Sequence, residues 1–478
     1  MAFQTFGYFV FLAVMTAGYF VLPVRMRWAL LLAGSYFFYM CWNASYALLM
    51  LLSTGVTYLC GLALGRAKTT AARKGCVATS LTINLSILFF FKYYGLLSGT
   101  LNSLPGDFVR LPQINVLLPV GISFYIFQAL GYTIDVYRGE IAPVRHFGKY
   151  ALFVSFFPQL VAGPIERSVN LIKQFDEVHR PDFESMRTGA VLVLAGLVKK
   201  LVVADRLAVL VDLVYSDVQR FGAPAVIVAT VCFAFQIYCD FSGYSDLAIG
   251  SAQILGFRLM KNFNRPYFSR SIGEFWRRWH ISLSSWFRDY LYFPLGGSRV
   301  CAVRWAFNIL VVFLVSGLWH GAAWTFAAWG LINGLYQVVG RFTRSGRDRL
   351  WKCVGVDPDG RLRSAVSLVC TFALTVFAWL FFRADSFEQL GLLLTKFVSG
   401  WEFESLFEMM HLVNGRECLL MAVAVAALLA SELPKTEWKD GIWRMPLPLR
   451  WMILLGLLFI LILFGKYNES PAFIYFQF

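Results

Sequence analysis

Residues 271–297 read SIGEFWRRWHISLSSWFRDYLYFPLGG, and residues 314–334 read LVSGLWHGAAWTFAAWGLING. Each segment places one histidine, His280 or His320, among apolar and aromatic residues. On a helix at about 100° per residue, one arc of roughly 140° contains Trp276, Trp279, His280, Leu283, Trp286, Phe287, Tyr290 and Leu291. The arginines lie outside that arc. We therefore predict one amphipathic helix with a cationic side, placed at a membrane interface or a cavity wall.

His320 lies in a run, residues 307–339, that contains no Asp, Glu, Lys or Arg. An ionisable group at membrane depth is costly, faces the protein interior or a water-filled cavity, and is a candidate functional residue. Burial favours the uncharged ring, which can accept a proton. The alternative for both histidines is a purely structural role, in which the ring packs in the interior and its nitrogens form hydrogen bonds with neighbouring residues.

The composition indicates a membrane protein. Of the 478 residues, 58% are hydrophobic, 17% aromatic and only 15% charged. The first residues are apolar but lack a basic start and a cleavage site, so we expect a transmembrane helix and no signal peptide. The net charge is +15, but the basic residues lie between apolar runs, so we expect membrane lipids and no nucleic acid as partners.

The apolar runs predict an all-α polytopic membrane protein around a central tunnel. We expect roughly ten to twelve transmembrane helices, with re-entrant and interfacial amphipathic helices between them. The runs lie at about 4–24, 28–41, 45–65, 78–98, 115–134, 147–163, 188–215, 224–256, 306–320, 322–340, 364–382, 416–431 and 449–465. Basic loops at 66–74 and 341–363 are assigned to the cytoplasm. No repeat or long linker is evident, so residues 1–478 are expected to form one domain, with a motif-bearing core at about 115–340.

Two segments carry residues that interrupt an apolar helix. The run 115–134 contains Gly121 and Gly131, which we expect to break the helix where its backbone lines a cavity. Glu166 and Arg167 follow a helix end rich in proline and glycine. A solvated charge pair is favoured there over a binding role. The nine cysteines form no CxxC pair and no cluster with histidine, which predicts neither disulfides nor a metal site.

The run 224–256 carries polar residues that include Gln236, Asp240 and Asp246. Carboxylates six residues apart point about 120° away from one another on a helix, so they are no acid–base pair. We expect each to meet its own basic or hydroxyl partner, and a structural ion pair is favoured over direct catalysis. Gln236 and Asp240 are kept as candidate substrate-binding residues.

Residues 258–270 interleave basic and aromatic side chains. Such a mixture can bind single-stranded nucleic acid. Before an amphipathic membrane helix, however, we favour an interfacial loop that touches lipid phosphates or an anionic ligand, such as a nucleotide-containing acyl donor. Asn264 in this loop, Arg277 on the cationic side of the next helix, and Trp319 beside His320 are further candidate substrate-binding residues.

Five strings carry a family resemblance: PVGISFYIFQALGYTIDVYRGE (119–140), FPQLVAGPIER (157–167), DFSGYSDLAIG (240–250), NFNRPYFSRSIGEFWRRWHISLSSWFRDYLYFPLGGS (262–298) and SGLWHGAAWTFAAWGLINGLY (316–336). Together they resemble the membrane-bound O-acyltransferase family, and most closely its bacterial alginate O-acetyltransferase-like branch. The C-terminal FIYFQF (473–478) is similar to that of this branch and of the D-alanyl transferase of teichoic acids. Several long strings in one order make the resemblance specific.

The resemblance implies transfer of an acyl group, acetyl being favoured, from a cytoplasmic thioester to a hydroxyl of an extracytoplasmic polysaccharide or a relay protein. It makes His320 the catalytic histidine and His280 the second active-site residue. A further histidine of the branch is replaced by Asn333, whose amide can orient a substrate but takes no proton at neutral pH. We expect His320 to act as base, with His280 orienting it or hydrogen-bonding the oxyanion.

The expected donor is acetyl-coenzyme A, with no permanently bound cofactor and no metal. The expected location is the cytoplasmic (inner) membrane, with a periplasmic or surface acetyltransferase as partner. Two alternatives stay open. A D-alanyl-type transferase would use an acyl carrier protein as donor. A non-enzymatic polysaccharide or lipid transporter would have inverted repeats, which we do not find, and would move solute without donor hydrolysis.

Overall fold

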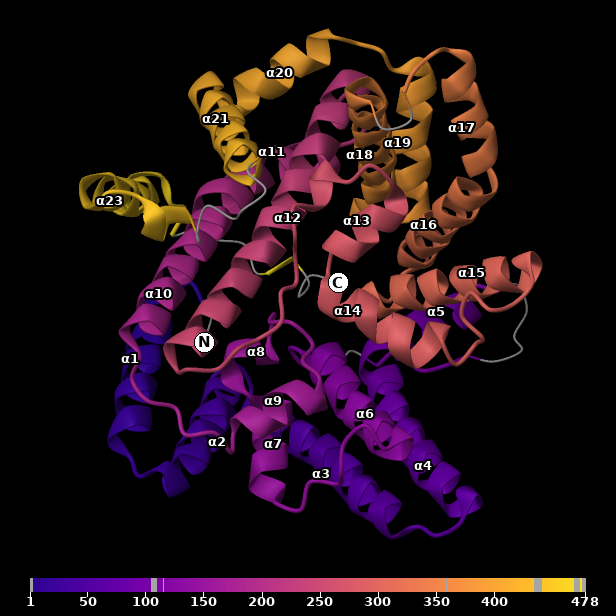
Figure 1. Ribbon diagram of the computed structural model, residues 1–478. Helices are drawn as coiled ribbons and strands as arrows, with labels where there is room; N and C mark the ends of the chain where they lie inside the picture. The colour runs from indigo at the N-terminus through magenta and orange to yellow at the C-terminus, as the bar shows by residue number, and fades with distance from the viewer. Residues whose placement is uncertain are drawn as a thin grey trace. The chain divides into compact units, whose positions relative to one another are not determined.

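The computed structural model describes residues 3–104, 110–114, 116–357, 360–433, 441–467 and 473–474, and within these ranges it contains helices and no strand (Figure 1). The predicted all-α class is confirmed. Helices satisfy their own backbone amides where lipid offers no hydrogen-bond partner. Contacts divide the chain into unit 1 (Met1–Val193 and Tyr244–Lys261) and unit 2 (Leu194–Gly243 and Asn262–Phe478). The division passes through α10 (Phe183–Leu197) and α12 (Ala223–Ile254).

Unit 1 contains the N-terminal helices. They are α1 (Phe6–Val21), α2 (Val24–Met40), α3 (Ala44–Arg66), α4 (Thr70–Leu88), η1 (Phe89–Tyr93), α5 (Tyr94–Asn102), α6 (Ile122–Arg138), α7 (Phe147–Ser155), α8 (Phe157–Leu160) and α9 (Ser168–Gln174). α3 packs against α4 and α6, and α2 packs against α7. Side-chain oxygens of Asn43 and Thr69 accept backbone N–H groups at the starts of α3 and α4, which stabilises both helix ends.

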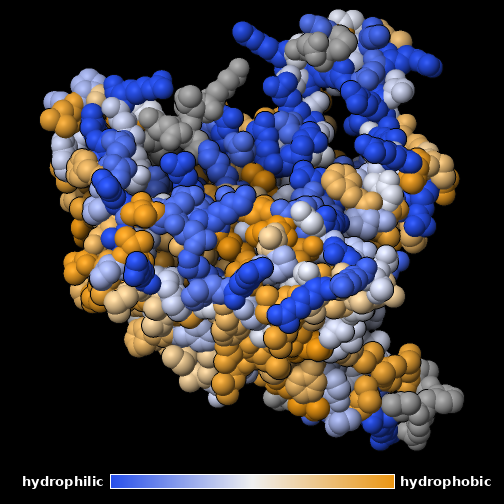
Figure 2. All heavy atoms as spheres, turned by 60° about the horizontal axis from the view of Figure 1, so that its bottom comes forward, coloured by the Kyte–Doolittle hydropathy of each residue, from blue (hydrophilic) through white to orange (hydrophobic). Residues whose placement is uncertain are grey.

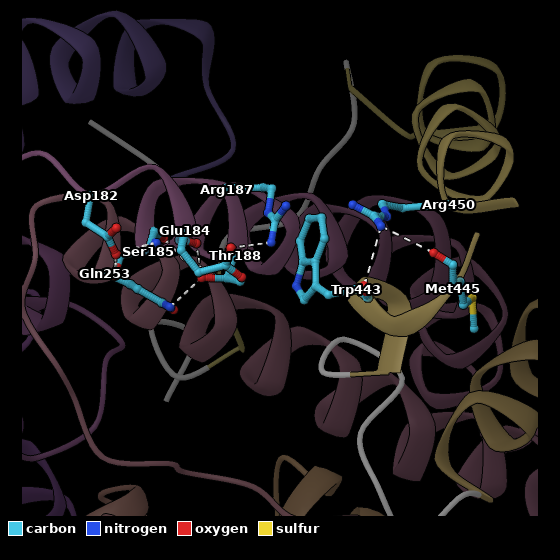
Figure 3. A network of polar contacts seen from close by, with 9 residues as sticks. All are labelled: Asp182, Glu184, Ser185, Arg187, Thr188, Gln253, Trp443, Met445 and Arg450. Atoms are coloured by element: carbon cyan, nitrogen blue, oxygen red, sulfur yellow. Dashed lines mark hydrogen bonds and ion pairs between the residues drawn. The ribbon is translucent and has the colours of Figure 1, made fainter. Parts of the chain in front are cut away.

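A polar network fixes the start of α10 within unit 1 (Figure 3). Asp182 accepts hydrogen bonds from the amide and the hydroxyl of Ser185, at 3.0 and 2.6 Å. This is the pattern of a helix N-cap. One turn further on, the Thr188 hydroxyl accepts from the side-chain amide of Gln253 at 2.7 Å. The last part of α12 is thereby tied to the first part of α10.

Unit 2 contains the two histidine-bearing segments, residues 271–297 and 314–334. Its elements are η2 (Val198–Ala204), α11 (Asp205–Ser216), η3 (Pro266–Phe268), α13 (Ile272–Arg278), α14 (Ile281–Phe287), η4 (Arg288–Tyr292), α15 (Ala302–His320), α16 (Trp324–Phe342), α17 (Arg344–Cys353), α18 (Arg361–Arg383), α19 (Phe387–Ser399), α20 (Glu404–Val413), α21 (Gly415–Glu432), η5 (Ile442–Arg444) and α23 (Leu447–Phe464). α15 and α16 form a hairpin, and α13 packs against both α16 and α18.

Six helices of the described chain are long and apolar enough to cross a membrane: α3, the continuous helix Thr70–Asn102, α12, α15, α18 and α23. α20 and α21, which meet at a bend of 94°, would add a seventh span. The polytopic class is confirmed, but this number is below the ten to twelve spans expected. One reason is that the run 147–163 forms two short helices, α7 and α8, because the chain is non-helical at Phe156.

Hydrophobic side chains cover much of the face shown in Figure 2. On α23, the large hydrophobic side chains of Trp451, Leu455 and Phe459 are exposed. A large exposed apolar surface is unfavourable in water but suits contact with lipid. The surface therefore agrees with a multi-pass membrane protein.

The predicted interruptions in unit 1 are borne out in part. α6 begins directly after Gly121, whose φ of +72° is readily adopted only without a Cβ. Gly131 lies inside α6 and does not break it. Glu166 is 2% exposed and accepts hydrogen bonds from the Asn170 side chain and the Met260 amide. The predicted solvated charge pair is therefore wrong, because the helix end is buried against a neighbouring segment.

Candidate active site

The segment predicted as one amphipathic helix, residues 275–291, is broken at His280. α13 ends at Arg278, Trp279 is extended, and His280 has φ +44° and ψ +54° before α14 starts at Ile281. This left-handed conformation costs a residue with a Cβ on the order of 1–3 kcal/mol, and it persists only where surrounding contacts hold it. The single-helix prediction is wrong because tertiary contacts at His280 override the local apolar periodicity.

Asn262 supplies those contacts. Its Oδ1 lies 3.0 Å from Nδ1 of His280 and accepts from the Ser282 hydroxyl and amide at 2.9 and 3.3 Å. The Asn262 carbonyl accepts from the Ile281 amide at 2.9 Å. A backbone N–H can only donate, so Oδ1 is the acceptor and the His280 Nδ1–H donates to it. The neutral His280 ring therefore keeps its proton on Nδ1 and presents Nε2 as an acceptor.

His320 reaches the same place from the last residue of α15. The two imidazole centroids are 6.3 Å apart, and the residues are 0% and 2% exposed. The Trp319 ring lies 5.9 Å from His280 and 5.0 Å from His320. Burial lowers the pKa of His280 to about 3, so this ring stays neutral at physiological pH. The fold thus brings together three of the predicted site residues: His280, Trp319 and His320.

Aromatic rings from three helices enclose the histidine pair. Phe241 of α12 meets His280 at 4.6 Å, and Trp329 of α16 and Phe382 of α18 lie 5.0 and 5.6 Å from His320. Such an apolar enclosure strengthens hydrogen bonds and disfavours unpaired charge. The surroundings therefore favour proton transfer between neutral groups.

Glycines let α15 and α16 approach closely enough to place His320 in this enclosure. A Cβ on Gly317 would lie 2.2 Å from the carbonyl oxygen of Phe326. A Cβ on Gly330 would lie 2.3 Å from the carbonyl oxygen of Phe313. Small residues of this kind allow membrane helices to pack backbone against backbone.

Asp240 belongs to a buried ion cluster. Nζ of Lys200 lies 2.7 Å from a carboxylate oxygen of Asp205 and 2.8 Å from one of Asp240. The three residues are 1%, 2% and 3% exposed. The ion pair expected for Asp240 is confirmed, and it joins η2, the start of α11 and the middle of α12.

The described end of the chain lies against the same part of α12. Asp240 accepts the Ile474 amide at 2.8 Å, and the Phe473 ring lies 5.5 Å from Phe241, the residue that packs on His280. Both tail residues are buried. The rest of the C-terminal string, residues 475–478, lies outside the described residues.

The remaining predicted residues do not all meet the histidines. Asn264 and Arg277 are exposed. Gln236 is half-buried, and its Oε1 has no hydrogen-bond partner among the residues that the structure describes. Asn333 is buried, and its side-chain amide donates to the carbonyl of Trp329, one turn earlier in α16, at 2.8 Å.

Sequence reasoning missed Asn262 and Lys200. Lys200 lies in the apolar run 188–215, and an ionisable residue in such a run is a signal that could have identified it. Asn262 carries no such signal, because only the fold distinguishes it from Asn264 two residues later. In the described ranges, no three His, Cys, Asp or Glu side chains are placed to hold a metal ion.

Comparisons with known proteins point to one family. Residues 143–351, which include both histidines, match the model of the membrane-bound O-acyltransferase family. The chain is 38% identical over 385 residues to the probable alginate O-acetylase AlgI of Pseudomonas aeruginosa, covering 80% of this chain and 71% of that protein. It is 33% identical over 412 residues to the peptidoglycan O-acetyltransferase of Helicobacter pylori, covering 80% and 76%.

A more distant similarity links the chain to the teichoic acid D-alanyltransferase of Streptococcus thermophilus. The two are 27% identical over 286 residues, covering 55% of this chain and 68% of that protein. All three relatives are named for acyl transfer.

Proposed function

The chain belongs to the membrane-bound O-acyltransferase family, and from this premise we propose that it moves an acetyl group from a cytoplasmic thioester to an extracytoplasmic hydroxyl. Its relatives and its apolar helices make it a multi-pass membrane O-acyltransferase. The donor, the direction of transfer, the cytoplasmic membrane as location and the acceptor, a polysaccharide or a relay protein, belong to the proposal. The pairing of His280 and His320 in an aromatic enclosure is the observation that carries it.

The proposed reaction is direct transfer with His320 as general base. His320 takes the proton of the acceptor hydroxyl as its oxygen attacks the thioester carbonyl. The C–O bond forms, the C–S bond breaks, and the proton passes to the leaving thiolate. General-base assistance typically supplies about 10²–10⁴-fold, so positioning of the two substrates supplies the larger share of the acceleration.

His280 is proposed to position the base, His320. A neutral ring that donates from Nδ1 to Asn262 has an acceptor at Nε2, which cannot donate to an oxyanion. Of the two roles expected for His280, orientation is therefore favoured over oxyanion stabilisation. Its Nε2 accepts a hydrogen bond from one ring N–H of His320, so that the other ring nitrogen of His320 takes the proton of the substrate hydroxyl.

Acetyl transfer in reconstituted vesicles tests the proposal. His320→Ala is expected to abolish transfer and His280→Ala to reduce it severely, with thermal melting temperatures close to that of the wild type. His411→Ala is the matched control, because His411 is exposed on α20. Near-normal turnover by a folded His320→Ala variant rejects the general base.

An acyl carrier protein as donor is the second candidate, which the similarity to a teichoic acid D-alanyltransferase favours. Acetyl-coenzyme A and a purified acylated carrier, offered separately to the same vesicles, distinguish the two donors. A non-enzymatic transporter is not proposed, because the chain belongs to a family of transferases.

A further inference from the structure

A cavity of about 980 Å³ lies in unit 2, between the second half of α16, the connecting helix α17 and the first half of α18. α18 is long and apolar enough to cross a membrane. α17 has the sequence RSGRDRLWKC, which is too polar to enter the hydrocarbon. The cavity therefore lies where a polar helix meets the ends of two apolar helices.

The lining of the cavity is cationic. Among the described residues that line it, one carboxylate, Asp348, stands against five arginines, at positions 270, 341, 344, 347 and 363. Asp348 pairs with Arg363 and lies 3.9 Å from Arg344. One carboxylate cannot balance five guanidinium groups, so the lining attracts an anion.

Contacts within the protein hold three of these arginines in place. The Arg341 guanidinium stacks at 4.1 Å on the Trp305 ring. Arg347 donates to a backbone carbonyl of α16 at 2.8 Å, and Arg270 donates to the Ser364 hydroxyl at 3.1 Å. A guanidinium has five N–H donors, so each group keeps donors for a ligand. Its planar fork matches two oxygens of a phosphate.

The cavity continues from the arginines along two apolar strips. Exposed apolar side chains line it on both long helices: Leu335 and Val339 on α16, and Val366, Cys370 and Leu374 on α18. Within each helix these residues are four apart and so share one face. From Arg363 to Leu374 is eleven residues, or about 16 Å along α18. One leaflet of a bilayer has about 15 Å of hydrocarbon, so the strip has the length of one leaflet.

We propose that this cavity binds an anionic phospholipid, with its phosphate among the arginines and its acyl chains along the strips of α16 and α18. A soluble phosphate compound would pair with the arginines but leave the strips exposed, whereas a phospholipid covers both. The basic loop 341–363 predicts a cytoplasmic position for this end of the helices, and the cytoplasmic leaflet is rich in anionic lipid. The inference goes beyond the proposed function and does not depend on the chemistry of His320.

The test is lipid binding by the purified full chain in neutral detergent, measured by native mass spectrometry. Phosphatidylglycerol is expected to bind about tenfold more tightly than phosphatidylcholine with the same acyl chains. Arg344→Gln/Arg347→Gln should weaken phosphatidylglycerol binding about tenfold or more, because each basic residue near an anionic headgroup contributes to affinity. Arg344→Lys/Arg347→Lys keeps both charges and should retain part of the binding. Both arginines are exposed, and melting temperatures close to that of the wild type show that the variants fold.

Arg349→Gln/Lys352→Gln is the matched control. It removes the same charge from the same helix, but both residues are exposed and neither lines the cavity. It should bind phosphatidylglycerol as the wild type does. Equal losses in the two glutamine double variants would show a general attraction to anionic lipid and overturn the site. Wild-type affinity in Arg344→Gln/Arg347→Gln also overturns it.

The deacylated headgroup, glycerophosphoglycerol, separates a lipid from a soluble phosphate ligand. It carries the same phosphate without acyl chains, so it should bind much more weakly than phosphatidylglycerol. Equal affinities for the two would assign the arginines to a soluble ligand and overturn the lipid site. Equal affinities for phosphatidylglycerol and phosphatidylcholine would show that the arginines do not select the headgroup, which also overturns it.

Discussion

His280 combines a strained backbone with a defined ring state. The left-handed φ of +44° is held by the contacts that residues 280–282 make with Asn262. Strain of this kind persists where surrounding contacts over-determine the conformation, often at functional sites. One loop side chain thus fixes both the position and the tautomer of the second histidine.

Asn262→Ala is expected to lower kcat about ten- to hundredfold. The variant removes a buried hydrogen-bond partner of His280, which costs about 1–3 kcal/mol. Asn264→Ala is the control, because Asn264 is exposed two residues away, and it should leave kcat near that of the wild type. Asn262→Asp keeps an acceptor and should retain more activity than the alanine variant. Equal kcat values for folded Asn262→Ala and wild type would show that the contact does not matter for turnover.

The ring state of His280 can be observed directly. Because burial lowers its pKa to about 3, His280 should remain neutral from pH 8 to about pH 4, with its proton on Nδ1. Histidine in the unfolded chain has a pKa of about 6.5, so below that pH the unfolded state binds a proton that folded His280 does not. Any loss of stability from this group therefore appears as the pH falls below about 6.5. Nitrogen chemical shifts of labelled histidine report the tautomer, and His280→Gln assigns the signal. A signal that titrates near pH 6.5 would contradict the burial argument.

At the scale of elements, the α15–α16 hairpin determines where His320 lies. The hairpin is close because Gly317 and Gly330 face the partner backbone. The apolar runs and their lengths predict both helices, but they do not predict this contact. Glycine in a membrane helix also occurs without a packing role. Gly340, in α16 like Gly330, has no atom within 4 Å of an added Cβ.

Gly330→Ala and Gly340→Ala form a matched pair on α16. The first places a methyl group against the Phe313 carbonyl and should cost about 1–3 kcal/mol of stability, as overpacking does. The second should leave stability unchanged or raise it slightly, because alanine favours helix over glycine. Thermal unfolding in detergent measures both. Equal melting temperatures for the two variants would mean that α15 and α16 accommodate the added methyl group at position 330 at no cost in stability.

At the scale of the whole chain, residues far apart in sequence meet at one buried cluster. Lys200, Asp205 and Asp240 form the cluster, and Asp240 also accepts the amide of Ile474. Breaking a buried ion pair by removing one partner is strongly destabilising, because a charge is left unpaired in an apolar setting. The cluster therefore connects the stability of α12 with the position of Ile474, the last described residue.

Lys200→Met is expected to destabilise the protein by about 3–5 kcal/mol, since two carboxylates lose their ammonium partner. Lys199→Met, at the adjacent half-buried position, is the control and should have a small effect. Adding Asp205→Asn and Asp240→Asn to Lys200→Met should recover part of the loss. Thermal unfolding in detergent provides the readout. If Lys199→Met lowered the melting temperature as much as Lys200→Met, the loss of the ion cluster would not be the cause of the destabilisation.

Local composition was sufficient to predict the all-α membrane class, the approximate limits of the long helices, and His280 and His320 as candidate site residues. Those features follow from local apolar composition and from the cost of an ionisable group in lipid, which act wherever the chain is folded. Three features could be read only from the folded chain: the helix breaks at His280, Asn262 rather than Asn264 holds that residue, and Lys200 pairs with Asp240. These features depend on contacts between residues distant in sequence, and their energies outweigh the local preferences from which a sequence pattern is read.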